Sequence, residues 1–234
     1  METISLPLDE VVALEDFSGV IPLFPLSTVV FFPHTLLPLH IFEPRYREMV
    51  NDVIDNEKII GMVLLKPGWE KDYAGNPEIF DVAGMGRIIN VESANDGRMN
   101  IVLYGLKRVR IVDIVKEHPY RSAKVEIMDN EHTRNDKQYS KRLDELVASW
   151  NKLLGKEYES KRIRLQRDFG LEQAVDFIAS SEISNVFEKQ DILEEKSLHK
   201  RAEKVISYLE TRYEIVSIME GKRPDQILEK RNLN

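Results

Sequence analysis

The spacing of hydrophobic positions changes near residue 130. Before it, short apolar runs alternate with turn residues, a pattern typical of strands and loops. The runs that predict strands are 20–32, 58–66, 79–91, 98–105, 108–117 and 121–128. Asn95-Asp96-Gly97 stands between two of these runs, and because Asp-Gly adopts positive φ easily, it predicts a β-hairpin. The first half is therefore expected to form a sheet.

One helix is expected among these strands. Apolar side chains recur there at helical spacing, and Pro44 suits a first helical turn. The stripe consists of Phe42, Tyr46, Met49, Val50, Val53 and Ile54.

The second half has the periodicity of helices throughout. Nine of the ten prolines lie at or before Pro119, so few residues here would break a helix. Three amphipathic stripes start at Tyr139, Leu171 and Leu198, and Ile183, Val186 and Phe187 indicate a short helix before the last. Each apolar stripe needs a partner surface, so the helices are expected to pack as a bundle or against the sheet.

The boundary between the halves is placed at Asp129–Asp136, which contains no apolar side chain. The fold class expected is α+β, with a strand-rich part followed by a helical part. The expected ranges are an acidic N-terminal arm at 1–17, a strand-rich domain at 18–128, a linker at 129–136, a helical subdomain at 137–220 and a C-terminal tail at 221–234.

Charge and composition narrow the function classes. The first twenty residues contribute five of the seven net negative charges, so the remaining chain is nearly neutral and nucleic acid is disfavoured as the main partner. The absence of cysteine excludes disulfides, thiolate metal sites and a cysteine nucleophile. The acidic N-terminus does not resemble a signal peptide, and the most apolar stretch, 28–42, is too short and too interrupted to span a bilayer. We therefore expect a cytoplasmic protein with no membrane partner.

Several motifs of the strand-rich half match a known family. They are Ile21-Pro22-Leu23-Phe24-Pro25-Leu26, Val29-Val30-Phe31-Phe32-Pro33-His34, Ile41-Phe42-Glu43-Pro44-Arg45-Tyr46 and Leu103-Tyr104-Gly105-Leu106-Lys107-Arg108. Together they resemble the N-terminal substrate-recognition domain of the Lon family of ATP-dependent proteases. The resemblance extends over about residues 18–218 and includes the helical half.

The resemblance implies a strand-rich, partly closed sheet of the pseudouridine-synthase-and-archaeosine (PUA) type, followed by a helical bundle. It also implies a free-standing, non-enzymatic module that binds exposed apolar or unfolded protein segments, or a partner protein, and needs no cofactor. The chain has no Gly-x-x-x-x-Gly-Lys-Ser/Thr phosphate loop, which agrees with this expectation. An RNA- or nucleotide-binding module is the alternative, because the fold type has RNA-binding relatives. The motif residues expected to be structural are Phe24, Pro25, Phe32, Pro33, His34, Pro38, Gly105 and Arg108.

The long connection at residues 66–78 holds the best candidates for a peptide contact. It is rich in turn residues yet contains Trp69 and Tyr73, and aromatic side chains on loops often contact apolar ligands. The alternative is that Trp69 folds back to cover the sheet.

Other reactive residue types give weaker signals. His34 and His40, with Glu43, could begin a zinc site, but Pro38 interrupts the segment, so no metal is expected. Glu195 and His199 have helical i, i+4 spacing, which is typical of a solvated surface pair more often than of an acid/base pair.

The remaining signals are also better explained by structure than by chemistry. Ser180-Ser181 lacks the context of a nucleophile and is interpreted as a helix stop and cap. The basic clusters 107–110 and 161–167 lack interleaved aromatics and are interpreted as solvated faces or intramolecular ion pairs. No catalytic residue is therefore expected.

Overall fold

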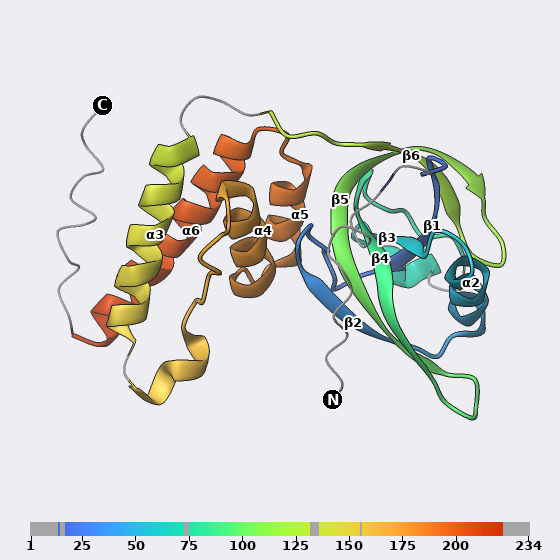
Figure 1. Cartoon of the computed structure of the whole chain (residues 1–234), viewed down its shortest axis with the longest axis horizontal. Helices are drawn as coiled ribbons and strands as arrows, with labels where there is room; N and C mark the ends of the chain where they lie inside the picture. Colours follow the sequence, from blue (N-terminus) through green and yellow to red (C-terminus); the bar gives the residue numbers. More distant parts are fainter. Residues whose placement is uncertain (1–13, 15–16, 73–74, 132–135, 155, 222–234) are drawn as a thin grey trace. The chain divides into compact units, whose positions relative to one another are not determined.

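The computed structural model describes residue 14 and residues 17–72, 75–131, 136–154 and 156–221. These residues pack into two compact units (Figure 1). The first unit takes its residues from 1–129 and from 184–194, and the second takes them from 130–183 and from 195–234. The chain therefore enters the first unit twice.

A six-stranded sheet forms the first unit. Its strands are β1 (Val20–Leu26), β2 (Leu36–Ile41), β3 (Ile59–Leu64), β4 (Val82–Ser93), β5 (Met99–Lys116) and β6 (Ser122–Ile127). Their order is β2-β5-β4-β3-β1-β6, and β5 also pairs with β6, so every strand except β2 belongs to a closed ring. Only β1 and β3 run parallel. The α+β architecture with a strand-rich pseudo-barrel is confirmed.

Gly84 and Gly105 allow main-chain segments that are far apart in the sequence to pack closely against each other. A Cβ atom on Gly84 would lie 1.9 Å from the Phe31 carbonyl oxygen, and one on Gly105 would lie 2.1 Å from that of Phe32. Only glycine permits so close an approach of two main chains. The segment between β1 and β2 is thus pressed onto β4 and β5, with both phenylalanine side chains buried.

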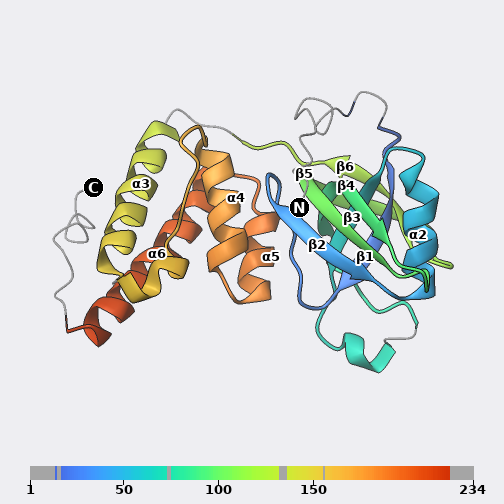
Figure 2. The ribbon, with the colours of Figure 1, turned by 60° about the horizontal axis from the view of Figure 1, so that its bottom comes forward.

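The helix α2 (Pro44–Ile54) closes one apolar cluster of this unit. Its buried residues Tyr46, Met49 and Val50 pack in one cluster with Phe24 of β1 and Ile101 of β5. Figure 2 shows the helix beside the strands. Tyr46, Met49 and Val50 of the predicted stripe form the buried face of this helix, whereas Phe42 precedes the helix and is exposed.

The strand boundaries differ from the sequence prediction at three places. The strand predicted at 20–32 ends at Leu26, and β2 lies in a segment for which no strand was predicted. The strands predicted at 98–105 and 108–117 are one continuous β5. His34 has a φ of 59°, which ends any extended run through the Phe-Pro-His block. The hairpin is confirmed, since Gly97 has a φ of 79° and its N–H donates to the Ala94 carbonyl oxygen at 2.9 Å.

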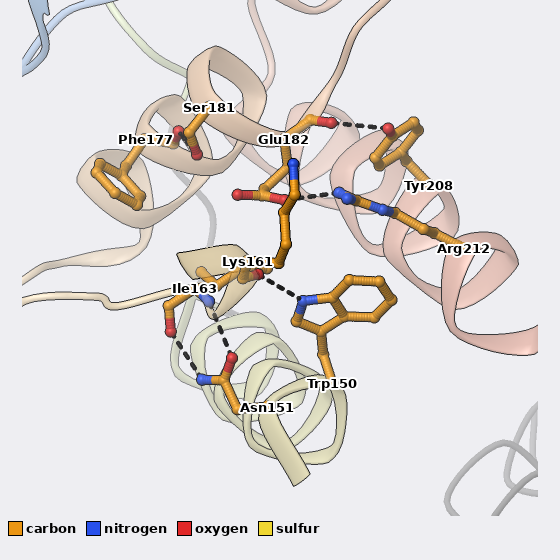
Figure 3. Close-up of polar contacts among 9 residues, drawn as sticks. All are labelled: Trp150, Asn151, Lys161, Ile163, Phe177, Ser181, Glu182, Tyr208 and Arg212. Carbon is orange, nitrogen blue, oxygen red and sulfur yellow. Dashed lines mark hydrogen bonds and ion pairs between the residues drawn. The ribbon is translucent and has the colours of Figure 1, made fainter. Parts of the chain in front are cut away.

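The second unit is helical. It contains α3 (Asp136–Leu153), the 3₁₀ turn η2 (Lys156–Lys161), α4 (Leu171–Glu182) and α6 (Leu198–Met219). Hydrogen bonds join the end of η2 and the residues after it to α3 (Figure 3). Trp150 Nε1 donates to the Lys161 carbonyl oxygen at 3.3 Å, and Asn151 bonds both main-chain groups of Ile163. Glu182 joins α4 to α6 through Arg212, at 2.6 Å.

The helix α5 (Val186–Glu194) packs in the first unit. Gln190 Nε2 donates to the Val82 carbonyl oxygen at 3.0 Å, and Arg108 Nη1 donates to the Leu193 carbonyl oxygen at 2.8 Å. Both side chains are buried, so α5 shields two strands of the pseudo-barrel from water.

Candidate functional site

A cleft of about 580 Å³ opens in the first unit beside the end of β1. Its lining comes from the end of β1, the start of α2, the 69–77 connection and the turn between β5 and β6. The residues are Pro25, Leu26, Ser27, Glu43, Arg45, Tyr46, Leu65, Trp69, Gly75, Asn76, Pro77, Glu117, His118, Pro119, Tyr120 and Arg121. A volume of this size is typical of ligand-binding clefts.

Two buried tyrosines contribute to the lining. Tyr46 is 4% exposed, and its ring centroid lies 4.1 Å from that of Phe24. Tyr120 is 7% exposed, and its hydroxyl donates to Asp52 Oδ2 at 2.5 Å. Burial and this hydrogen bond raise the pKa of Tyr120 well above its usual value, so its phenol stays neutral. The two tyrosines therefore form a fixed part of the cleft wall, with little of either ring exposed.

Trp69 adds an aromatic side chain that is less deeply buried. It begins the 3₁₀ turn η1 (Trp69–Asp72), is only half-buried, and lines the cleft. A half-buried indole keeps apolar surface available for a ligand. Tyr73, the other aromatic candidate from the sequence, lies outside the described residues.

Arg121 fixes one wall of the cleft. Its Nε donates to Asn76 Oδ1 at 3.2 Å and its Nη2 donates to the Pro77 carbonyl oxygen at 2.8 Å. Asn76 in turn donates to Glu117 Oε2 at 3.1 Å. Through these bonds the 75–77 segment is held against the turn between β5 and β6, which gives the cleft a defined width.

On the α2 side, the charges that line the cleft neutralise each other. Arg45 Nη2 lies 3.0 Å from Glu43 Oε2, and the Arg45 guanidinium stands 4.7 Å from the centroid of the Tyr46 ring. Such pairing leaves little net field to attract a highly charged ligand.

The motif residues lie mostly in the core of the first unit. Phe24 packs on Tyr46, Phe32 is fully buried beside Gly105, and Arg108 is 1% exposed in its bond to α5. Pro33 is buried next to His34, whose main-chain N–H donates to the Gly105 carbonyl oxygen at 2.8 Å. Pro38 is exposed on β2, and Pro25 lines the cleft.

The i, i+4 spacing of Glu195 and His199 is not helical in the structure. The helix α6 begins at Leu198 after the N-cap Ser197, so Glu195 precedes it and its Oε1 accepts from the Ser197 N–H at 2.9 Å. His199 Nε2 instead lies 2.7 Å from Asp136 Oδ1, and its ring stacks on Tyr139. The sequence prediction of a helical pair was wrong because α6 begins only at Leu198, after Glu195.

The basic clusters form ion pairs or lie in the core. Arg162 and Arg164 both contact Glu159, at 2.9 Å and 2.8 Å. Arg108, in the other cluster, is buried against α5. The contacts of Arg162 and Arg164 are ion pairs of the kind expected for the cluster 161–167, whereas burial of Arg108 against a main-chain carbonyl was not expected.

A buried ion pair lies within the second unit. Arg201 and Asp176 lie 3.5 Å apart with both side chains 0% exposed, and they join α6 to α4. Because neither group is open to solvent, this pair is a packing feature of the helices and offers no surface for chemistry.

Sequence reasoning missed most of the cleft. Tyr46 was assigned to a helix stripe, and the His118–Arg121 turn was not singled out at all. The signal for the second was present, since Pro119 and Tyr120 interrupt two predicted strands. Only the three-dimensional pairing of β1 with β3 and β6 brings these segments together.

No helix within the described residues is both long and apolar enough to cross a membrane.

Comparison with known proteins gives a consistent result. The family model of the ATP-dependent protease La (LON) substrate-binding domain matches residues 20–211. The Lon protease of Dictyoglomus thermophilum is 28% identical over 206 residues, which cover 87% of this chain and 26% of that protein. The Lon protease of Anaeromyxobacter dehalogenans is 25% identical, over 87% of this chain and 24% of its own. The chain thus spans about a quarter of the length of these relatives.

Two solved structures share the fold. A Lon N-terminal domain protein from Xanthomonas campestris aligns with a TM-score of 0.57 and 20% identity, covering 81% of this chain and 98% of its own. The N-terminal domain of Mycobacterium avium complex Lon protease aligns with a TM-score of 0.61 and 13% identity, covering 82% and 98%. All these matches concern the substrate-binding part and not the ATPase or protease part.

Proposed function

Because the chain belongs to the LON substrate-binding domain family, we propose that it binds exposed apolar segments of unfolded proteins in the cleft beside β1. The observation that carries this proposal is the aromatic lining, in which half-buried Trp69 is accompanied by the buried rings of Tyr46 and Tyr120. Aromatic side chains dominate the binding energy of protein contacts when a ligand removes them from water.

The dimensions of the cleft suit a short part of a chain. About 580 Å³ accommodates a few side chains, well short of a folded domain. A segment must therefore be unfolded, or project from its protein, before it can enter.

The pairing of charges favours uncharged segments. Arg45 is paired with Glu43, and Arg121 donates to the neutral acceptors Asn76 and Pro77. A bound segment would have to replace these contacts before it used the arginines, so the binding free energy comes mainly from apolar burial.

Binding to an unfolded model protein tests this function. Reduced, carboxymethylated α-lactalbumin presents apolar segments that its native form buries, and calorimetry measures its dissociation constant. We expect binding of the unfolded form only, with affinity at least about tenfold weaker for Trp69→Ala, because a desolvated indole contributes about 2 kcal/mol or more.

Phe42→Ala is the matched control. Phe42 is an aromatic residue 60% exposed on the surface of the same unit, and it does not line the cleft. Its loss should leave affinity unchanged. Equal losses for both variants, or an affinity that falls steeply with salt as phosphate-driven binding does, would contradict the proposal.

A further inference from the structure

The main-chain groups of β1 alternate between its two edges. Toward β3, the Leu26 carbonyl oxygen accepts from the Leu65 N–H at 3.0 Å. On the opposite edge, the Leu23 N–H donates to the Arg121 carbonyl oxygen at 2.8 Å. Pro25 stands two residues after Leu23, so its carbonyl group is directed to this same edge, away from β3.

The strand that would continue to pair with this edge is displaced from it. β6 pairs with β1 through Val20, Ile21 and Pro22, and one further main-chain bond joins Leu23 to Arg121. Beyond that point the chain turns through His118–Arg121, and the cleft lies between this turn and the end of β1, since both line it. The cleft therefore occupies the place where a neighbouring strand would lie.

Proline at position 25 determines what this edge can offer. Proline has no main-chain N–H, so Pro25 presents only its carbonyl oxygen, an acceptor. A complementary ligand has to bring a donor, and the main-chain N–H of an extended segment is a donor with the geometry of a strand edge.

From this arrangement we infer that the bound segment lies extended beside β1 and donates one main-chain N–H to the Pro25 carbonyl oxygen, while its apolar side chain enters the cleft. The inference rests on the proposed function and specifies how the cleft recognises the main chain of its ligand. The ligand class is a stretch of uncharged, extended chain that does not have proline at the donating position.

The uncharged character of the segment follows from charge complementarity. Arg45 is neutralised by Glu43 at 3.0 Å, and Arg121 is held by Asn76 and by Pro77. A formally charged segment would lose its hydration on entry and would have to displace the acceptors that already hold these two arginines.

The donor requirement also distinguishes unfolded from helical chain. Beyond the first turn of a helix, each N–H is bonded within the helix and is not available to a partner. An extended segment presents alternate N–H groups on one side. Selection of unfolded segments thereby follows from the hydrogen-bond donor as well as from apolar surface.

A backbone-modification scan of the ligand tests this inference, since substitution of a side chain cannot delete the Pro25 carbonyl oxygen. The probe is a capped peptide with a single phenylalanine among alanines and serines, which fixes one register. Each backbone nitrogen is methylated in turn, and affinity for the full-length protein is measured. We expect one position near the phenylalanine to weaken binding about fivefold to tenfold, the effect of one net hydrogen bond.

An ester at the same bond is the control, because it removes the N–H without adding a methyl group. The ester should reproduce the loss. A flat scan, or a sensitive position at which the ester binds normally, overturns the inference. Loss of binding in Trp69→Ala with a flat scan would leave the proposed function standing and remove only the strand-edge contact, whereas a wild-type protein that binds no form of the peptide overturns both.

Discussion

The aromatic residues of the cleft differ in burial, and burial separates their roles. Tyr46 is 4% exposed and belongs to the apolar cluster under α2, while Trp69 is half-buried and belongs to a 3₁₀ turn. The free energy of unfolding depends on the first kind of residue more than on the second. A binding role and a packing role can therefore be told apart by substitution.

Trp69→Ala should lower the free energy of unfolding by less than about 1.5 kcal/mol, as for most partly exposed positions. Tyr46→Ala, its matched control, should lower it by about 3 kcal/mol or more, because a large cavity forms in a packed cluster. Urea denaturation measures both. If Trp69 instead covers the sheet, as the alternative sequence interpretation holds, its substitution would cost as much as that of Tyr46.

Arg108 shows what residue types alone do not reveal. In the sequence it belongs to a basic cluster interpreted as a solvated face or as intramolecular ion pairs, but the structure buries it to 1% exposure and bonds it to Leu193. Its partner is 85 residues away along the chain, so no local pattern identifies it.

At the scale of elements, helix periodicity was the stronger signal. The stripes beginning at Tyr139, Leu171 and Leu198 are the faces of α3, α4 and α6. Strand limits were less predictable because pairing partners set them. β5 runs through Gly105 since it pairs with β2 over its first part and with β6 over its last part.

The α3–α6 contact has a titratable component. The Tyr139 hydroxyl donates to Glu203 Oε1 at 2.6 Å, and this bond, aided by burial, raises the pKa of Tyr139 to about 12. The folded protein thus holds the phenol proton more tightly than the unfolded chain does. The resulting stability is fully present below about pH 10, the pKa of an ordinary tyrosine, and is lost as the pH rises toward 12.

Tyr139→Phe keeps the ring on His199 but removes the hydroxyl. We expect a loss of about 1 kcal/mol at pH 8, and a difference from the wild type that shrinks between pH 10 and 12. Glu203→Gln, which keeps an acceptor without the charge, should show a smaller pH dependence. Denaturation curves at several pH values measure this, and a wild-type–variant difference that grows above pH 10 would contradict the assignment.

The position of α5 bears on whether the halves can be separated. This helix follows the boundary predicted at 129–136, yet it packs on β4 in the first unit through Gln190. A fragment that ends in this boundary region loses α5 and leaves the Arg108 guanidinium without its Leu193 acceptor, which is costly for a buried charge.

We therefore predict that cutting the chain between Asp129 and Asp136 gives two pieces that do not both fold alone. The first piece should melt at a lower temperature than the intact chain, and fusing residues 184–194 to it through a flexible linker should restore part of the loss. Calorimetry of both pieces checks this. Sharp, cooperative melting of both unmodified pieces as monomers would show that α5 is dispensable.

At the scale of the whole molecule, the family assignment came from motif combinations, whereas the cleft came from the fold. The motifs Phe32-Pro33-His34 and Gly105-Leu106-Lys107-Arg108 pack against each other because Gly105, which has no Cβ atom, leaves room for the main chain of Phe32. The cleft joins segments between residues 25 and 121, and no spacing along the chain indicates their contact.

The chain is expected to bind without turnover. The family match concerns the substrate-binding domain, and the sequence contains no phosphate-binding loop. Purified protein should therefore neither hydrolyse ATP nor cleave an unfolded substrate. Phosphate release and fluorogenic peptide assays measure these activities, with Trp69→Ala prepared in parallel so that contaminating enzymes show as activity common to both. Turnover that copurifies with the protein through successive columns would contradict this prediction.

The central claim is that unfolded segments enter the cleft beside β1, and the two tryptophans of the chain report on it directly. Trp69 lines the cleft, while Trp150 is 2% exposed in the helical unit with its indole N–H bonded to Lys161. The measurement is a titration of ¹⁵N-indole-labelled protein with reduced, carboxymethylated α-lactalbumin, followed by nuclear magnetic resonance. The account predicts that the Trp69 indole signal shifts or broadens with saturation while the Trp150 signal stays in place. Binding that leaves the Trp69 signal unchanged would contradict it.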